Sequence, residues 1–319
     1  MGFAYTPFLL TLGACHNFTS VDDACKSKVI GEKHIAHSSS AEALLRINCY
    51  RRLAKVGVIT VDKIVQATTE DHVDYMNALD DFNVYSPGIE DSANPGYTGV
   101  TLNDRLEAKN WAGDVRNLDR WELTPWNWPF SGADNVDYLF PDPWVRQIYL
   151  QPTVIAGGFD EGLSGAGDSG WTSYTAILYR QPTGHAPFVY PVDGQTGIDP
   201  SYYDQVLGGA LVEYGEIGYP ITITVDASVI VLRDFSLSGP SGDVDTVVNL
   251  PGDVSWGSSL RGTVAITPLD ALEPSSEYTF NATVEWDGAV SKLESIFTTG
   301  AINTRPATEY SGSTSSYSR

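Results

Sequence analysis

The feature that most constrains the fold is a change of sequence pattern near residue 219. Before it, apolar residues recur every three or four positions over several stretches, which indicates amphipathic helices. After it come only short alternating or β-branched runs, separated by Gly, Pro, Ser and Asp as strands are. These runs are residues 221–225, 229–237, 246–250, 264–266, 278–286 and 293–298. A chain of 319 residues has room for two such units, because most domains contain about 50 to 250 residues.

The first unit combines helices with later strands. Capping-box spacings at Ser39 with Glu42 and at Thr101 with Asp104, together with apolar periodicity, predict helices over 39–57, 62–79 and 101–110. A further helix is expected over 136–149, interrupted by Pro141 and Pro143. Strands are expected over 153–156, 171–180 and 188–190. This order predicts an α+β fold. We divide the chain into an N-terminal segment (1–38), a mixed domain (39–218), an all-β immunoglobulin-like sandwich (219–300) and a flexible tail (301–319).

The charge of the chain disfavours several classes of partner. There are 40 acidic and 19 basic side chains, a net charge of −21, so nucleic acid and anionic lipid surfaces would repel the protein. No apolar run approaches the ~20 residues that a membrane-spanning helix needs. Plentiful Gly, Trp and Tyr with few lysines are typical of a turn-rich exported protein.

The N-terminus has two interpretations. Residues 1–14 are mostly apolar and end in Leu12, Gly13 and Ala14, and with Cys15 they are similar to a bacterial lipobox, in which the cysteine carries a lipid anchor. However, no Lys or Arg precedes the apolar stretch, so the positive region of a signal peptide is missing. If Cys15 is lipidated, Cys25 and Cys49 remain as a pair for one disulfide. The alternative for Cys49 is a buried thiol.

Residues 120–130 contain three tryptophans and two prolines within eleven positions. We expect this segment to form an irregular loop, because proline breaks both helices and central strands. Trp121, Trp126 and Trp128 either pack inside the domain or provide a docking surface for a partner.

Several short motifs occur in a particular order. Asn48 and Arg51 precede Gly57 and the helix bearing His72, and the run Pro-Gly-Tyr-Thr-Gly at 95–99 precedes Asp104 and Arg105. Later motifs are Val136 to Leu139, Ile148-Tyr149, Tyr190-Pro191, Asp193 to Gly197, Gly218 to Pro220, Leu272 to Pro274, Tyr278 and Phe297 to Gly300. This order resembles the CAP superfamily (cysteine-rich secretory, antigen 5, pathogenesis-related 1; SCP-like), in its bacterial branch with a C-terminal Ig-like module. The resemblance implies an α-β-α sandwich for the first domain.

The resemblance also implies a cleft in which two histidines and two acidic residues hold a metal such as zinc. In this chain Gly88 and Leu150 stand where the two histidines are expected, and neither side chain can bind a metal or move a proton. Glu90 and Glu161 are the candidates for the remaining acidic pair, and His72 is either a structural histidine or a remnant of the cleft. We therefore predict no catalytic residue, no metal and no cofactor.

The resulting hypothesis is a non-catalytic CAP-domain protein, secreted or held at the cell surface or outer envelope. It would act as a binding or assembly module for a protein, glycan or lipid. Three alternatives stay open: a metal-dependent hydrolase with relocated ligands, a lipid- or sterol-binding protein, and an accessory subunit of a large extracellular or membrane-anchored complex. A different histidine clustered with acidic side chains in the groove would favour the hydrolase.

Overall fold

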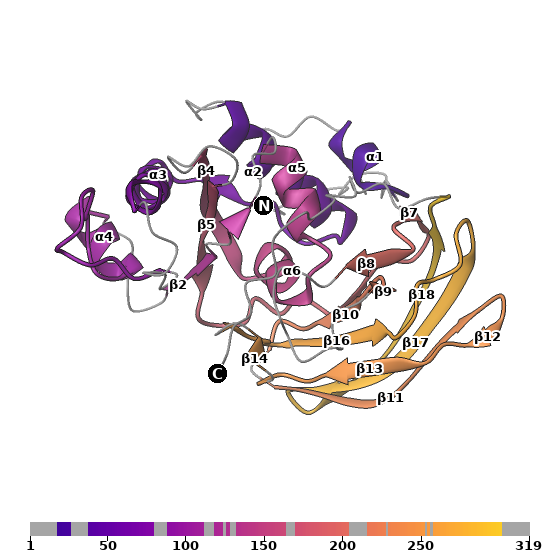
Figure 1. Cartoon of the computed structure of the whole chain (residues 1–319). Helices are drawn as coiled ribbons and strands as arrows, with labels where there is room; N and C mark the ends of the chain where they lie inside the picture. The colour runs from indigo at the N-terminus through magenta and orange to yellow at the C-terminus, as the bar shows by residue number, and fades with distance from the viewer. Residues whose placement is uncertain are drawn as a thin grey trace, which may run out of the picture.

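The computed structural model combines helices and strands, and the α+β prediction is confirmed (Figure 1). It describes residues 18–26, 38–79, 88–111, 118–123, 126–127, 132–163, 170–203, 216–227, 229–252, 254–255 and 258–301. Cys15, Trp128 and the tail beyond residue 301 lie outside these ranges. Within them, no helix combines the length and the apolarity that crossing a membrane requires.

Four of the helices in the described residues begin directly after a capping residue, namely Ser20, Asp62, Thr101 and Asp142. The helices are α1 Val21–Cys25, α2 Ser38–Leu53, α3 Lys63–Ala78, α4 Leu102–Ala108, α5 Gly132–Leu139 and α6 Pro143–Leu150. Asp62 caps α3 by accepting hydrogen bonds from the backbone N–H groups of Ile64 and Val65, and Thr101 forms a capping box with Asp104. The prolines separate α5 from α6 as predicted, since Asp142 caps α6 and Pro143 occupies its first turn.

One capping prediction is wrong. We expected Ser39 to cap the first long helix, but α2 begins one residue earlier, at Ser38. The Ser39 hydroxyl accepts a hydrogen bond from the backbone N–H of Gly132 at 2.8 Å and contacts the carboxylate of Glu161. This hydroxyl therefore joins α2 to α5 and to the sheet instead of closing the helix end.

The first sheet lies between two layers of helices (Figure 1). Its strands run in the order β1-β4-β5-β2, with β3 also paired to β5; their bounds are β1 Thr60–Val61, β2 Leu118–Leu123, β3 Trp126–Asn127, β4 Val154–Leu163 and β5 Gly170–Tyr179. Helix α3 packs against one face at Gly158, where a Cβ atom would lie 2.8 Å from the Cα of Gln66. On the other face α6 places Tyr149 against Tyr174, with ring centroids 5.1 Å apart.

The prediction of an irregular loop over residues 120–130 is wrong for residues 120–123 and 126–127, which lie in strands β2 and β3. Residues Leu118–Leu123 form β2, which pairs antiparallel with β5 over its whole length. Strand β2 ends at Leu123, before the first proline of the segment, so no proline interrupts its hydrogen bonds. Trp121 is partly buried against the main hydrophobic core, and the guanidinium of Arg261 lies 5.2 Å from its ring centroid. Trp121 thus packs on the core with part of its side chain, and its role in docking a partner stays a prediction.

Two further sheets form the C-terminal part. One has the order β13-β16-β10-β6, the other β12-β11-β17-β18-β7, and both contribute buried residues to the main hydrophobic core. The bounds are β6 Phe188–Tyr190, β7 Gln195–Ile198, β10 Ile221–Thr224, β11 Ile230–Gly239, β12 Gly242–Asp243, β13 Thr246–Asn249, β16 Thr263–Pro268, β17 Glu277–Trp286 and β18 Ala289–Thr299. Short pairs add β8 Ser201–Tyr203 with β9 Glu216–Gly218, and β14 Val254–Ser255 with β15 Ser258–Ser259.

Two strands from before residue 219 belong to these C-terminal sheets. Strand β6 pairs antiparallel with β10, and β7 pairs parallel with β18. The domain boundary at residue 219 stays a prediction, but the chain enters the second group of sheets about thirty residues earlier and then returns to it.

Two buried arginines connect segments that are far apart in the sequence. Arg51 on α2 donates hydrogen bonds to the backbone carbonyls of Gly57, Tyr149, Gln151 and Val154. Arg146 on α6 is fully buried, and its donors reach carbonyls of its own helical layer and of the chain just before β10. Because a buried guanidinium needs several acceptors, both side chains fix the positions of the segments that they bind.

The predicted disulfide is confirmed. Cys25 and Cys49 are bonded, with their Cα atoms 5.0 Å apart, and the bond holds α1 against α2. The alternative, a buried thiol at Cys49, is therefore wrong. In the chain-entropy view a bond that closes a loop of this length stabilises the fold by about 3 kcal/mol.

Candidate functional site

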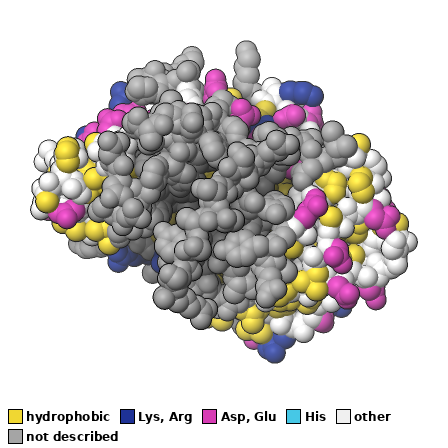
Figure 2. Space-filling model, viewed as in Figure 1, with side chains coloured by type: hydrophobic (Ala, Val, Ile, Leu, Met, Phe, Trp, Pro, Cys, Tyr) yellow, Lys and Arg dark blue, Asp and Glu magenta, His cyan; other side chains and the backbone are white. Residues whose placement is uncertain are grey.

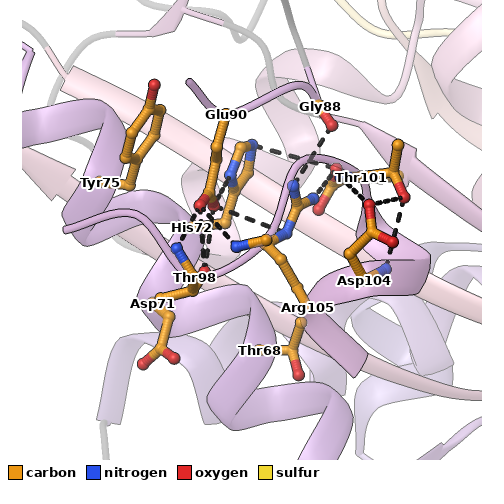
Figure 3. Close-up of polar contacts among 12 residues, drawn as sticks. Thr68, Asp71, His72, Tyr75, Gly88, Glu90, Thr98, Thr101, Asp104 and Arg105 are labelled. Atoms are coloured by element: carbon orange, nitrogen blue, oxygen red, sulfur yellow. Dashed lines mark hydrogen bonds and ion pairs between the residues drawn. The ribbon is translucent and has the colours of Figure 1, made fainter. Parts of the chain in front are cut away.

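A buried group of titratable side chains surrounds His72 on α3 (Figure 3). Its Nδ1 lies 2.9 Å from Oε1 of Glu90, and its Nε2 lies 3.9 Å from Oε2 of Glu122. Glu90 comes from the loop between α3 and α4, and Glu122 comes from β2. The fold thus places one imidazole between two carboxylates that are far apart in sequence.

Arg105 on α4 completes this group, which we call the His72 cluster (His72, Glu90, Arg105 and Glu122). Its Nη2 donates to Glu122, its Nε lies 3.6 Å from Oε1 of Glu90, and its Nη1 donates to the backbone carbonyl of Gly88 at 3.3 Å. One permanent cation therefore contacts both carboxylates, and it also contacts the position at which the family resemblance would place a histidine.

The motif at residues 95–99 serves this cluster. The Glu90 carboxylate accepts hydrogen bonds from the backbone N–H groups of Thr98 and Gly99, at 2.7 and 3.3 Å, and from the Thr98 hydroxyl. Tyr75 holds the same loop on α3, because its hydroxyl accepts a hydrogen bond from the backbone N–H of Asp91 at 2.8 Å. Glu90 thus organises the loop that leads into α4.

The His72 cluster is closed to solvent. The side chains of His72 and Glu90 are 0% exposed, that of Arg105 is 1% exposed and that of Glu122 is 7% exposed. Nε2 of His72, Nε of Arg105 and Oε1 of Glu122 have no hydrogen-bond partner among the described residues. An imidazole between two carboxylates is the composition of a general acid–base site, and in this structure all three side chains are buried.

Burial and hydrogen bonding act in opposite directions on Glu90. Desolvation by burial raises the pKa of its carboxyl, but the hydrogen bonds from His72 and Thr98 and the charge of Arg105 outweigh it, so the pKa is lowered below 4.5. Glu90 is therefore an ionised acceptor that anchors its neighbours.

The metal that the family resemblance implies does not fit these residues. The Arg105 guanidinium contacts both carboxylates, which would be the ligands, and a dication there would meet this cation at close range. In the part of the chain that the structure describes, no group of three His, Cys, Asp or Glu side chains has the arrangement of a metal site. Leu150 is buried on α6 among apolar neighbours.

The other sequence candidates lie elsewhere. Glu161 on β4 contacts Ser39 of α2 and Asn135 of α5, so the structure does not bring it together with Glu90 and His72. Desolvation by burial raises the pKa of Glu161, although the bonds from Ser39 and Asn135 oppose this. Trp126 lies in β3, and its side chain is outside the described part.

Sequence reasoning missed Glu122 as a member of the site. The signal was the alternation along residues 118–123, in which Leu118, Arg120 and Glu122 share one face and Trp121 lies on the other. Treating the whole tryptophan-rich stretch as a loop concealed that alternation.

Glu90 and Glu161 should give opposite contributions to the pH dependence of stability. The pKa of Glu90 is lowered in the folded state, so its ionisation stabilises the fold above its ordinary pKa of 4.5, and this contribution is lost as pH falls through the folded-state pKa. We expect E90Q to be less stable than the parent at about pH 6, with the difference shrinking towards about pH 3. Urea unfolding across this range measures it.

Glu161 provides the matched comparison. Its pKa is raised in the folded state, so the parent loses stability at this residue as pH rises through the ordinary value of 4.5. The stability difference between the parent and E161Q should therefore change with pH in the opposite direction. If the stability differences of E90Q and E161Q from the parent changed with pH in the same direction, the opposite pKa shifts of Glu90 and Glu161 would be contradicted.

Comparisons with known proteins add little to this geometry. No family model matches the chain, and no curated protein is significantly similar to it. Among solved structures, an extracellular protein containing an SCP domain from Bacillus anthracis is similar at a TM-score of 0.31 and 15% identity, over 48% of this chain and 45% of that chain. A protein from Bacteroides thetaiotaomicron is similar at a TM-score of 0.17 and 10% identity, over 33% of this chain and 91% of that chain. The alignment with the first structure spans less than half of its length, and TM-scores this low support no argument about function.

Proposed function

We propose that the protein is an exported, non-catalytic binding module with an SCP-like first domain and an immunoglobulin-like second domain. The observation that carries the proposal is the state of the His72 cluster: its acid and base groups are buried, and Arg105 contacts both carboxylates. Such a cluster stabilises the loop between α3 and α4 and leaves the protein to act through its surface.

Export is supported by the disulfide. A bond between Cys25 and Cys49 forms and persists in an oxidising compartment, such as a periplasm or the exterior of a cell. The net charge of −21 suits such a setting and disfavours anionic partners. A lipid anchor at Cys15 remains part of the proposal; the intact mass of the native protein would reveal the acyl chains or a free N-terminus.

The alternative hydrolase makes a different prediction, which tests the proposal directly. Purified full-length protein should contain no stoichiometric zinc by elemental analysis, and should not cleave generic ester, phosphoester or peptide substrates above the background. The control variant is H185Q, because His185 lies against Phe188, outside the His72 cluster. Zinc at one equivalent, with an activity that H72Q abolishes and H185Q retains, would overturn the non-catalytic assignment.

A further inference from the structure

A pocket of about 530 Å³ opens where the helical layer meets the C-terminal sheets. Its wall is formed by α1, α2 and α5 on one side and by β7 with the chain around Tyr190 and Tyr219 on the other; Figure 1 shows α1, α5 and β7 beside one another. The volume lies within the range of about 300 to 1,000 Å³ that is usual for small-molecule sites. No residue of the His72 cluster contributes to it.

An ion-pair network shapes one wall of this pocket. Arg46 donates from Nε to Asp137 and from Nη1 to Asp22, each at 2.6 Å, and Asp137 also accepts a hydrogen bond from the Tyr50 hydroxyl at 2.8 Å. The side chain of Arg46 is only 17% exposed, and its Nη2 makes no hydrogen bond with the described residues. The pocket therefore contains a largely buried, positioned donor beside acceptor carboxylates.

The charges of the lining residues exclude one class of ligand. Asp22, Asp134, Asp137 and Asp199 line the pocket together with one arginine, Arg46. An anionic ligand would be repelled by these carboxylates and, at longer range, by the net charge of −21. Figure 2 shows acidic side chains spread over the described part of one face of the molecule.

A purely cationic ligand fits less well than a hydroxylated one. An ammonium group only donates hydrogen bonds, so it could pair with the carboxylates but would leave Nη2 of Arg46 desolvated without an acceptor. A hydroxyl group both donates and accepts, so neighbouring hydroxyls of one ligand can satisfy the carboxylates and the guanidinium together. Tyr138, which is partly buried beside these groups, adds an aromatic ring for the C–H face of a sugar.

We propose that this pocket binds a neutral oligosaccharide. The proposal rests on the non-catalytic binding function and specifies its ligand class: hydroxyls bonded to the aspartates and Arg46, and one sugar ring packed on Tyr138. The pocket joins the helical layer to β7, so the ligand would contact both parts of the molecule at once.

The test uses the full-length protein and three trisaccharides of different charge. They are triacetylchitotriose, which is neutral, its deacetylated form, which is cationic, and trigalacturonate, which is anionic. We expect calorimetry or ligand-observed NMR to show binding of the neutral sugar with a Kd of about 1 mM or tighter, and none of the anionic sugar. Y138A and D199N should each weaken that binding by about tenfold or more.

Y179A is the matched control, because Tyr179 is 46% exposed at the end of β5 and does not line the pocket. It should bind the neutral sugar as the parent does, and circular dichroism should show that all three variants are folded. Binding of the cationic sugar alone, or of no sugar, would overturn the proposal. If binding survives both Y138A and D199N, the sugar binds elsewhere and the assignment of this pocket is wrong. The non-catalytic function is tested separately, by the zinc and hydrolysis measurements.

Discussion

Replacing Arg105 with methionine should destabilise the protein by about 3 to 5 kcal/mol, the usual cost of removing one partner from a buried charge cluster. Glu90 and Glu122 would then face each other across His72 without the guanidinium that contacts both. The carbonyl of Gly88 would lose its donor as well. Urea unfolding of R105M, followed by tryptophan fluorescence, measures the loss.

Two further variants identify its origin. In R105M/E122Q one of the two buried charges is also removed, so we expect the double variant to be more stable than R105M alone. K109M is the matched control, because Lys109 follows the same helix and pairs with Asp71 at the surface, at side-chain exposures of 29% and 35%. It should change stability by no more than about 1 kcal/mol. An unfolding midpoint of R105M equal to that of the parent would refute the structural role of the cluster.

The local signals in the sequence predicted the elements well where a capping residue or a proline marks a boundary. Asp62, the Thr101–Asp104 box and the Pro141–Pro143 break each appear where expected. These signals work because they act through hydrogen bonds and sterics within a few residues. Ser39 failed because a distant partner, Glu161, competes for its hydroxyl.

Long-range pairing left no comparable signal. The parallel pairing of β7 with β18 joins residues about one hundred positions apart, and the meeting of His72 with Glu122 depends on β2 pairing with β5. The sequence predicted His72 and Glu90 as candidate residues but could not indicate that Arg105 lies between the two carboxylates. That contact is why a metal does not fit the His72 cluster: both carboxylates that would bind the metal already contact the guanidinium of Arg105.

Arg146 should be the second residue whose loss is costly, because it links the helical layer to the C-terminal sheets. It donates to the carbonyls of Phe140, Pro141 and Pro220 at 3.1, 2.8 and 2.6 Å. Its guanidinium also lies about 5 Å from the ring centroids of Tyr190 and Tyr219. Replacement with methionine leaves three buried carbonyls without this donor, so we expect a loss of about 3 kcal/mol or more.

The position of Arg146 also predicts how unfolding should change. Since its hydrogen bonds cross from α6 to the chain before β10, R146M should weaken the coupling of the two parts, and the thermal transition should broaden or divide. R146K restores the charge but offers a single ammonium in place of the planar guanidinium, so it should recover only part of the stability.

R233M is the control: Arg233 pairs with Glu285 at the surface, and its loss should cost no more than about 0.5 kcal/mol. A single sharp transition for R146M at the temperature of the parent would show that the contact of the two parts does not depend on this arginine.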